Sequence, residues 1–200
     1  AAGVADEALY KVLKSLTVSQ SKKLNVPPYV IFQEPSLQDM ALKYPLSYGE
    51  LVNIHGVGEG KAKKYGTPFL EAINQYVTDN DIYRPQDLVV KSTGANSVLK
   101  LYIIQNIDRK LPLDDIAQAK GLTTDDLIKE MEQIVFSGTK LSLGYWVDEI
   151  LDEDQQEELH DYFLQSDSDD IETANAAFDG DYEEEELRLY RIVFISEVAN

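Results

Sequence analysis

Apolar side chains recur at helical spacing along most of this chain, and this periodicity limits the fold more than any other feature. The first helix is predicted at residues 5–16, with an apolar face formed by Leu9, Val12, Leu13 and Leu16. No apolar run approaches the roughly 18 residues that a membrane-spanning helix needs. The sequence therefore predicts a mainly α-helical globular fold, with no contact to a membrane.

Five helices are predicted within residues 4–78, which makes this segment a compact domain. Pro27 and Pro28 exclude a helix through that point, so the apolar residues around them are expected in a buried extended or 3₁₀ connection. Ser36 is expected to cap the second helix. Ser47 opens a capping-box pattern, which predicts the start of the third helix.

A turn with two glycines separates the third helix from the fourth, which is predicted over residues 59–65. The segment Leu51-x-x-Ile54-x-Gly56-Val57-Gly58-x-x-x-Ala62 has the spacing of a helix-hairpin-helix motif. Gly56 and Gly58 permit the backbone angles of a tight turn, and the amides that follow are suited to bind a phosphate oxygen. Gly-x-Gly is also common as a simple connection between helices. Thr67-Pro68 is expected to start the fifth helix.

Lysines and one tyrosine are further candidates for contact with nucleic acid. Lys61, Lys63 and Lys64 lie one turn beyond the glycines, where they either add positive charge or form a solvated face. Tyr29, beside the two prolines, is placed either to stack on an unpaired base or to join the core. The residues alone leave both alternatives open.

Residues 79–97 are predicted to be a linker, because turn-forming residues are concentrated there. A second helical domain follows over residues 98–200. It contains Ile116-Ala117-x-x-x-Gly121-Leu122-Thr123-x-x-x-Leu127, which has helix-turn-helix spacing, with a cap expected at Thr123 or Thr124. Residues 139–147 are expected to form a short hairpin or wing. The last three helices are predicted at residues 153–165, 170–178 and 183–198.

The net charge of −18 is distributed very unevenly. Residues 1–78 carry +1, residues 79–144 carry −2 and residues 145–200 carry −17. The last segment is excluded as an independent DNA-binding surface, because carboxylates repel phosphates. The second helix of the helix-turn-helix begins Thr124-Asp125-Asp126, so it is expected to act as a scaffold or a protein-docking element rather than as a reader of duplex DNA.

No catalytic or metal site is predicted. The chain has no cysteine and only two histidines, so a thiolate zinc site and a multi-histidine site are excluded. The sequence contains no G-x-x-x-x-G-K-[ST] phosphate loop. The acidic residues of the loop near residue 170 lack the EF-hand pattern and are expected to be solvated; they are Asp167, Asp169, Asp170 and Glu172.

Three motifs, in order along the chain, resemble the HRDC domain, which is named for helicase and RNase D C-terminal. They are Asn25-Val26-Pro27-Pro28-Tyr29-Val30-Ile31-Phe32, Leu37-x-x-Met40-Ala41 and Ile54-x-Gly56-Val57-Gly58-x-x-Lys61-Ala62-x-x-Tyr65-Gly66-x-x-Phe69-Leu70. The first motif looks more like bacterial RecQ DNA helicases than like RNase D. Residues 90–200 are similar to the helix-turn-helix extension of RecQ proteins from the Bacteroides group.

The resemblance implies the C-terminal accessory region of an ATP-dependent, 3′ to 5′ RecQ DNA helicase that acts in DNA repair and recombination. It implies an HRDC domain at residues 4–78 that binds single-stranded or branched DNA weakly. The residues implicated in DNA contact are Tyr29, Lys22, Lys23, Lys61, Lys63 and Lys64, beside the hairpin residues Gly56 and Gly58.

The same resemblance sets the expectations for cofactors and location. ATP, Mg and Zn are expected only in upstream domains of the parent protein, and none of them in this chain. The chain lacks an initiator methionine, which predicts a piece of a longer protein. The expected location is the bacterial cytoplasm, at the nucleoid.

Two other functions stay open. The acidic helices of residues 145–200 are suited to dock a basic protein partner or the parent's own motor, which would make the chain a protein-interaction or autoregulatory module. A third alternative is the tail of an RNase D-like exonuclease.

Overall fold

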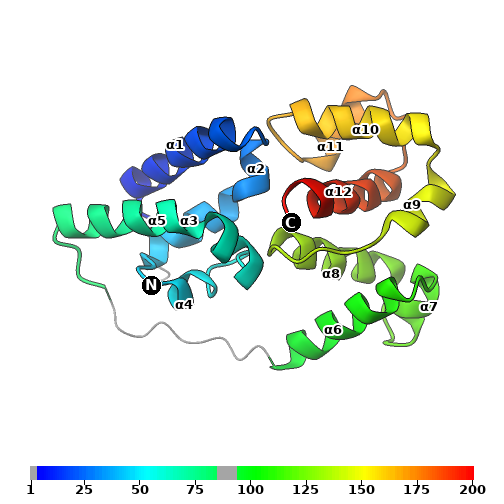
Figure 1. Ribbon diagram of the computed structural model, residues 1–200, viewed down its shortest axis with the longest axis horizontal. Coiled ribbons are helices and arrows are strands. Elements are labelled where there is room, and N and C mark those ends of the chain that lie inside the picture. Colours follow the sequence, from blue (N-terminus) through cyan, green and yellow to red (C-terminus); the bar gives the residue numbers. More distant parts are fainter. Residues whose placement is uncertain (1–3, 85–93) are drawn as a thin grey trace. The chain divides into compact units, whose positions relative to one another are not determined.

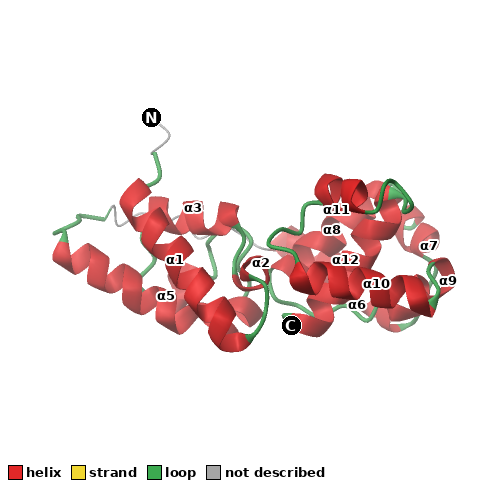
Figure 2. Ribbon diagram, turned by 90° about the horizontal axis from the view of Figure 1, so that it is seen from above, coloured by secondary structure: helices red, strands yellow, loops and turns green. Residues whose placement is uncertain are grey.

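The computed structural model describes residues 4–84 and 94–200, and the chain divides into two compact units, Ala1–Lys91 and Ser92–Asn200. Every regular element in the described residues is a helix, as Figure 1 and Figure 2 show. This confirms the predicted mainly α-helical fold. Of the predicted linker, residues 85–93 lie outside the described residues.

The first unit contains five helices among its described residues, but they are not the predicted five. They are α1 (Glu7–Leu24), α2 (Pro28–Ile31), α3 (Glu34–Lys43), α4 (Tyr48–Leu51) and α5 (Glu59–Asp79). Helix α1 extends well beyond residue 16. Helix α2 is a single turn at the place where the sequence predicts an extended or 3₁₀ connection. Pro28 is its first residue, a position at which the missing proline amide breaks no helical hydrogen bond.

The predicted break at Thr67-Pro68 is wrong, because α5 runs through Pro68 without interruption. Tyr65, Phe69 and Ile73 form one buried stripe at i, i+4 and i+8 across the proline. Packing of this stripe holds the helix together, although Pro68 donates no backbone hydrogen bond. The predicted fourth and fifth helices are therefore one helix.

The prediction that Ser36 caps the second helix is also wrong. Helix α3 begins before it, at Glu34, and Ser36 is buried within the first turn. Its Oγ donates a hydrogen bond of 2.8 Å to the carbonyl of His55, which ties α3 to the glycine hairpin. Ser47 does cap α4, since its Oγ accepts a hydrogen bond of 3.2 Å from the amide of Glu50.

A carboxylate network stabilises the start of the first unit. Asp6 caps α1 by accepting a hydrogen bond of 3.0 Å from the Leu9 amide, and it also accepts from the hydroxyls of Tyr44 at 2.9 Å and Tyr76 at 3.0 Å. Burial on its own would raise the pKa of Asp6, but these hydrogen bonds outweigh burial and lower it. Burial and the Asp6 carboxylate raise the pKa of Tyr44 to about 12. The network joins α1 to the C-terminal ends of α3 and α5.

The second unit has seven helices in its described residues. They are α6 (Gly94–Asp108), α7 (Leu113–Gln118), α8 (Thr124–Phe136), α9 (Gly144–Ile150), α10 (Glu153–Gln165), α11 (Ile171–Ala177) and α12 (Glu184–Val198). Helices α6 to α8 include the predicted helix-turn-helix. The bounds of α10, α11 and α12 agree with the predicted bounds to within one residue.

The hairpin or wing predicted at residues 139–147 is wrong. Helix α9 begins at Gly144, and residues 139–143 form no strand. Leu141, Leu143 and Val147 are buried, and the Leu141 amide donates a hydrogen bond of 3.1 Å to Ser196 Oγ on α12. The segment therefore packs against a helix instead of pairing with a second strand.

Helix α12 forms the centre of the second unit. Nine of its fifteen residues are buried, so it is enclosed on most of its circumference. Helices α8, α9, α10 and α11 pack against it, and Figure 1 shows it between α8 and the α10–α11 pair. Phe163 of α10 packs on Tyr190 and Phe194 of α12, with ring centroids 6.3 and 5.7 Å apart.

Candidate nucleic-acid interface

The glycine hairpin of the first unit is held by α3. Gly56 has a φ of +70°, a conformation that favours glycine, and a Cβ at this position would lie 2.9 Å from Ser36 Oγ. The His55 amide donates a hydrogen bond of 2.8 Å to Asp39 Oδ2, and the His55 carbonyl accepts from Ser36. Two hydrogen bonds to α3 therefore fix the turn that leads into α5.

The first turn of α5 has no side-chain cap. Its N-cap residue is Gly58. The φ of Gly58 is −98°, a value that any residue can adopt, so glycine is not needed here for its backbone freedom. Its effect is that no side chain is present to cap the helix. The first-turn amides consequently donate no hydrogen bond to a side chain of the capping residue. The exposed carboxylate of Glu59 lies in the same turn and opposes the binding of an anion. The Tyr48 hydroxyl donates a hydrogen bond of 2.9 Å to the Glu59 carbonyl.

The lysines of the first unit fall into two groups. Ion pairs with nitrogen–oxygen distances between 2.8 and 3.2 Å occupy three of them, namely Lys11, Lys14 and Lys43. Lys22, Lys23 and Lys63 are exposed and form no ion pair with residues that the structure describes. Lys64 is also exposed, and its Nζ lies 5.4 Å from the centroid of the Tyr65 ring. Four of the predicted contact lysines are therefore on the surface.

Helix α2 lies between the exposed lysines of α1, Lys22 and Lys23, and those of α5, Lys63 and Lys64. Lys22 and Lys23 end α1, directly before the turn that leads to α2. Phe32, which follows α2, packs against Tyr65 and Phe69 of α5, with ring centroids 6.4 and 4.8 Å apart. These contacts bring the end of α1, α2 and the second turn of α5 into one region of the first unit.

Two of the predicted contact residues are not on the surface. Tyr29 is 8% exposed. Of the two alternatives that the sequence leaves open, stacking on a base or joining the core, the structure places Tyr29 in the core. Lys61 is 2% exposed and belongs neither to a solvated face nor to a positively charged surface. In this structure neither side chain offers a surface to DNA.

The second unit contains a well-formed helix-turn-helix. Helices α7 and α8 are joined by a turn in which Gly121 has a φ of +66°. Thr123 is the N-cap of α8, and its capping box is completed by Asp126. The local structure of a DNA reader is therefore present.

Helix α8, the helix that enters the major groove in such readers, has one broad buried face. Five apolar residues form this face, namely Leu127, Ile128, Met131, Ile134 and Val135. The opposite face is polar, and Asp125, Asp126, Lys129 and Gln133 are exposed on it. The buried face fixes α8 against the rest of the unit.

Two arginines of α12 pair with carboxylates of α8. Arg188 contacts Asp125 and lies 2.6 Å from Glu132, and Arg191 lies 2.7 Å from the same glutamate. Arg191 also donates a hydrogen bond of 2.8 Å to the carbonyl of Asp169. Glu132 therefore belongs to an internal network that Asp125 joins from the surface, which favours the scaffold role expected from the sequence.

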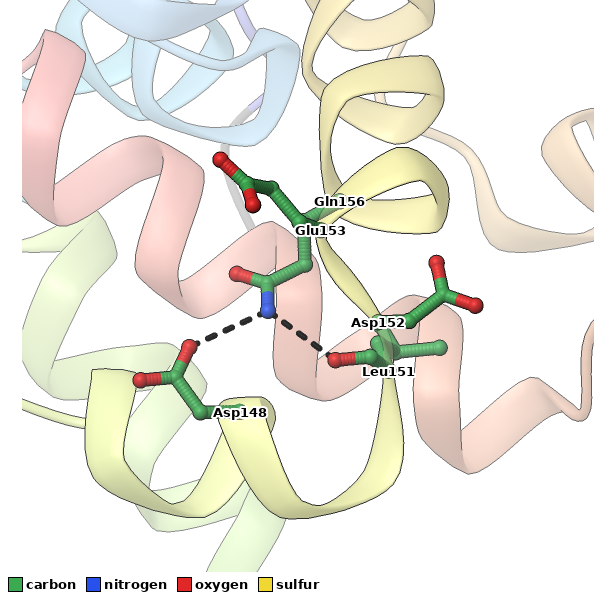
Figure 3. A pocket seen from close by; sticks show the side chains of 5 residues that line it. All are labelled: Asp148, Leu151, Asp152, Glu153 and Gln156. Carbon is green, nitrogen blue, oxygen red and sulfur yellow. Dashed lines mark hydrogen bonds between the residues drawn. The ribbon is translucent and has the colours of Figure 1, made fainter.

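The carboxylates of the last segment face solvent. Of the nineteen Asp and Glu residues in residues 145–200, seventeen are exposed, whereas the two arginines of this segment are used internally. Figure 3 shows a hollow between α9 and α10, lined by Asp148, Leu151, Asp152, Glu153 and Gln156. There the Gln156 amide donates hydrogen bonds of 3.0 Å to Asp148 and to the Leu151 carbonyl. The surface of this segment is thus strongly negative.

Of the acidic residues near residue 170 that are predicted to be solvated, Asp167, Asp170 and Glu172 are exposed, whereas Asp169 is half-buried. Asp169 lies 3.7 Å from Arg191, and Asp170 caps α11 through the Thr173 amide at 2.8 Å. Among the described residues, no group of three or more His, Cys, Asp or Glu side chains is arranged to hold a metal ion. In the same part of the chain, no helix is both long and apolar enough to cross a membrane.

Comparison with protein families gives two matches. Residues 6–73 match the HRDC domain, and residues 97–147 match the RecQ-1-like helix-turn-helix domain. Neither of these domains is an ATPase motor.

The matches to curated relatives are about as long as the HRDC match. The ATP-dependent DNA helicase RecQ of Haemophilus influenzae is 38% identical over 76 residues, which are 37% of this chain and 12% of the relative. RecQ of Bacillus subtilis is 36% identical over 81 residues, 40% of this chain and 14% of the relative. The ATP-dependent DNA helicase UvrD2 of Mycobacterium tuberculosis is 37% identical over 68 residues, 34% of this chain and 10% of the relative. The chain thus matches only a small part of each relative's length.

Proposed function

This chain carries the HRDC domain and the helix-turn-helix domain of a RecQ C-terminal region, and we propose that it is an accessory, DNA-binding region of a RecQ-type helicase. The HRDC domain makes weak contacts to single-stranded or branched DNA. The parent helicase unwinds DNA in the 3′ to 5′ direction during repair and recombination, in the cytoplasm at the nucleoid. ATP hydrolysis belongs to that parent's motor and not to this chain.

The observation that carries this proposal is the set of exposed lysines around the hairpin. Lys22, Lys23 and Lys63 form no ion pair among the described residues, and the contacts of α2 bring their helices together. Lysines that are already paired must break an ion pair to bind phosphate, whereas these three need not. The uncapped amides at Gly58 add hydrogen-bond donors in the same region.

A few lysines that contact phosphates give weak binding that depends strongly on salt. Each phosphate neutralised on a single strand lowers the slope of log affinity against log salt by about 0.7. The binding energy then comes mainly from released counterions, so affinity is high only at low ionic strength.

Fluorescence anisotropy of the full chain with a labelled 20-nucleotide oligo(dT) tests the proposal. We expect binding at low salt that weakens as salt rises, and a roughly 3- to 10-fold loss in the double variant Lys22→Ala, Lys63→Ala. The matched control is Lys11→Ala, Lys14→Ala, which removes two lysines already held in ion pairs. Equal losses in the two double variants, or no binding by the unaltered chain, would contradict the proposal.

The exposed carboxylates of residues 145–200 favour a second candidate function. With both arginines of this segment buried against α8, the surface of the acidic helices is suited to a basic partner or to the DNA-binding face of the parent's motor. Replacing Glu183, Glu184 and Glu185 by glutamine in the parent tests this function. Competition with DNA predicts tighter DNA binding by that variant, and unchanged binding argues against it.

A further inference from the structure

The first unit has an exposed aromatic ring beside the hairpin, and it is not the one that the sequence singles out. Tyr29 is 8% exposed, whereas Tyr48 is 44% exposed. Tyr48 is the first residue of α4, directly after the capping residue Ser47. Nothing in the sequence marks Tyr48 except its position, eight residues before Gly56.

The Tyr48 ring is held against α5. Its hydroxyl donates a hydrogen bond of 2.9 Å to the carbonyl of Glu59, the first residue of α5. In an α-helix the carbonyl of residue i points towards residue i+4, which is Lys63 here. The phenol is therefore anchored to the first turn of α5, one helical turn before the exposed Lys63. Because the anchor already restricts the ring, little side-chain entropy remains to be lost when a ligand binds.

This arrangement joins the three kinds of group that a single strand needs. An exposed aromatic face stacks on a base of any sequence, an ammonium group binds phosphate, and amides without a side-chain cap donate to a second phosphate oxygen. The hairpin is fixed by Ser36 and Asp39 of α3, so the three groups keep their relative positions. Tyr29 cannot supply the aromatic face while it remains in the core.

We propose that Tyr48 is the residue on which an unpaired base of single-stranded DNA stacks, with Lys63 binding the adjoining phosphate. Tyr29 then acts as a positioning residue that holds α2 in the core. This inference rests on the proposed function and names the base-contacting residue of the same interface.

Substitution of Tyr48 in the full chain tests the assignment, with labelled 20-nucleotide oligo(dT) at low salt as the probe. Tyr48→Ala and Tyr48→Leu are expected to weaken binding by about 5-fold or more, the lower end of what loss of one stacked base gives. Tyr48→Phe keeps the ring and is expected to bind within about 2-fold of the unaltered chain. Circular dichroism checks that the variants keep their helices.

Tyr83→Ala is the matched control. Its ring is 87% exposed and follows the C-terminal end of α5, the end opposite to the first turn that Tyr48 contacts. The next residue, Arg84, pairs with Glu50 of α4, so this control lies in the same unit but not at the hairpin. We expect it to leave affinity unchanged. An equal loss in Tyr83→Ala and Tyr48→Ala would overturn the assignment.

An oligonucleotide without bases separates stacking from phosphate contact. An abasic strand of the same length is expected to bind the unaltered chain and Tyr48→Ala equally, because no base is left to stack. If Tyr48→Ala binds oligo(dT) normally while Lys22→Ala, Lys63→Ala does not, the stacking assignment fails and the proposed function stands. If the unaltered chain binds no oligonucleotide, both are wrong.

Discussion

The two units of this chain are built from the same kind of element but differ in what surrounds the cations that they expose. In the first unit, Lys22, Lys23 and Lys63 stay on the surface, outside any ion pair among the described residues, and the unit is nearly neutral. The second unit also exposes cations that form no ion pair in the part that the structure describes, Arg109 and Lys110 among them, but it holds Arg188 and Arg191 between α8 and α12 and turns most carboxylates of residues 145–200 to solvent. The exposed cations of the second unit therefore lie on a strongly negative unit, which opposes its approach to a phosphate backbone.

Removal of α12 gives the largest expected effect and breaks the second half of this comparison. A chain that ends at Asp181 keeps the whole helix-turn-helix region but uncovers Ile128 and Val135 of α8. We expect the second unit to lose its cooperative unfolding, measured by circular dichroism during urea denaturation, while the first unit keeps its transition. Two intact transitions in the shortened chain would show that α12 is not the centre of this unit.

Breaking the internal arginine network comes next. Arg191→Ala leaves the Glu132 carboxylate without one of its partners in a site where both side chains are at most 14% exposed. Removing one member of a buried ion pair costs about 3–5 kcal/mol when the other charge is left uncompensated. Glu132 keeps its pair with Arg188, so the free energy of unfolding of the second unit is expected to fall by less than this amount. Lys129→Ala is the control, because Lys129 pairs with Asp125 on the open surface, and it is expected to leave the urea midpoint nearly unchanged.

The two glycine turns offer a direct comparison between the units. Gly56 and Gly121 both have positive φ, so alanine at either position costs about 1–2 kcal/mol. A Cβ at Gly56 would also meet Ser36 Oγ, whereas nothing lies within 4 Å of one at Gly121. We therefore expect Gly56→Ala to be the more destabilising by about 1 kcal/mol in urea unfolding, through loss of the Ser36 hydrogen bond. Equal losses would mean that α3 does not hold the hairpin.

The smallest effect concerns pH and the first unit. Because the pKa of Asp6 is lowered in the fold, its contribution to stability is present above the unfolded pKa near 4 and is lost as pH falls through the folded pKa. Asp6→Ala is expected to cost about 1 kcal/mol at pH 7, mainly as a lost cap. In Asp6→Asn, the stability difference from the unaltered chain should shrink as pH falls below 4. A difference that does not change with pH would show that the charge of Asp6 contributes nothing.

The sequence predicted best those helices that begin at a capping side chain. A cap at Thr123 or Thr124 was predicted, and Thr123 is the N-cap of α8. Helices α10 and α11 start within one residue of the predicted positions, where Asp152 and Asp170 act as N-caps. Helix α5 was misread because Pro68 is a strong local signal for a helix start. Only the packing of its buried stripe against the rest of the unit overrides that signal.

The candidate interface was predictable in part, for a related reason. The residue types marked the hairpin and its lysines, but burial of Tyr29 and Lys61 depends on how α2 and α5 pack in three dimensions. Tyr48 became visible only through its exposure and its hydrogen bond to Glu59. The internal role of Arg188 likewise depends on contact between helices more than fifty residues apart in sequence.

A two-dimensional ¹H–¹⁵N NMR titration of the full chain with 20-nucleotide oligo(dT) at low salt tests the division between the units most directly. The account predicts shifts confined to the first unit, at Lys22 and Lys23, at Tyr48 and at residues 56–64. Their size should fall as salt rises, while α7, α8 and the acidic helices α10 to α12 stay unchanged. Shifts centred on α8, or on the acidic helices, would contradict it.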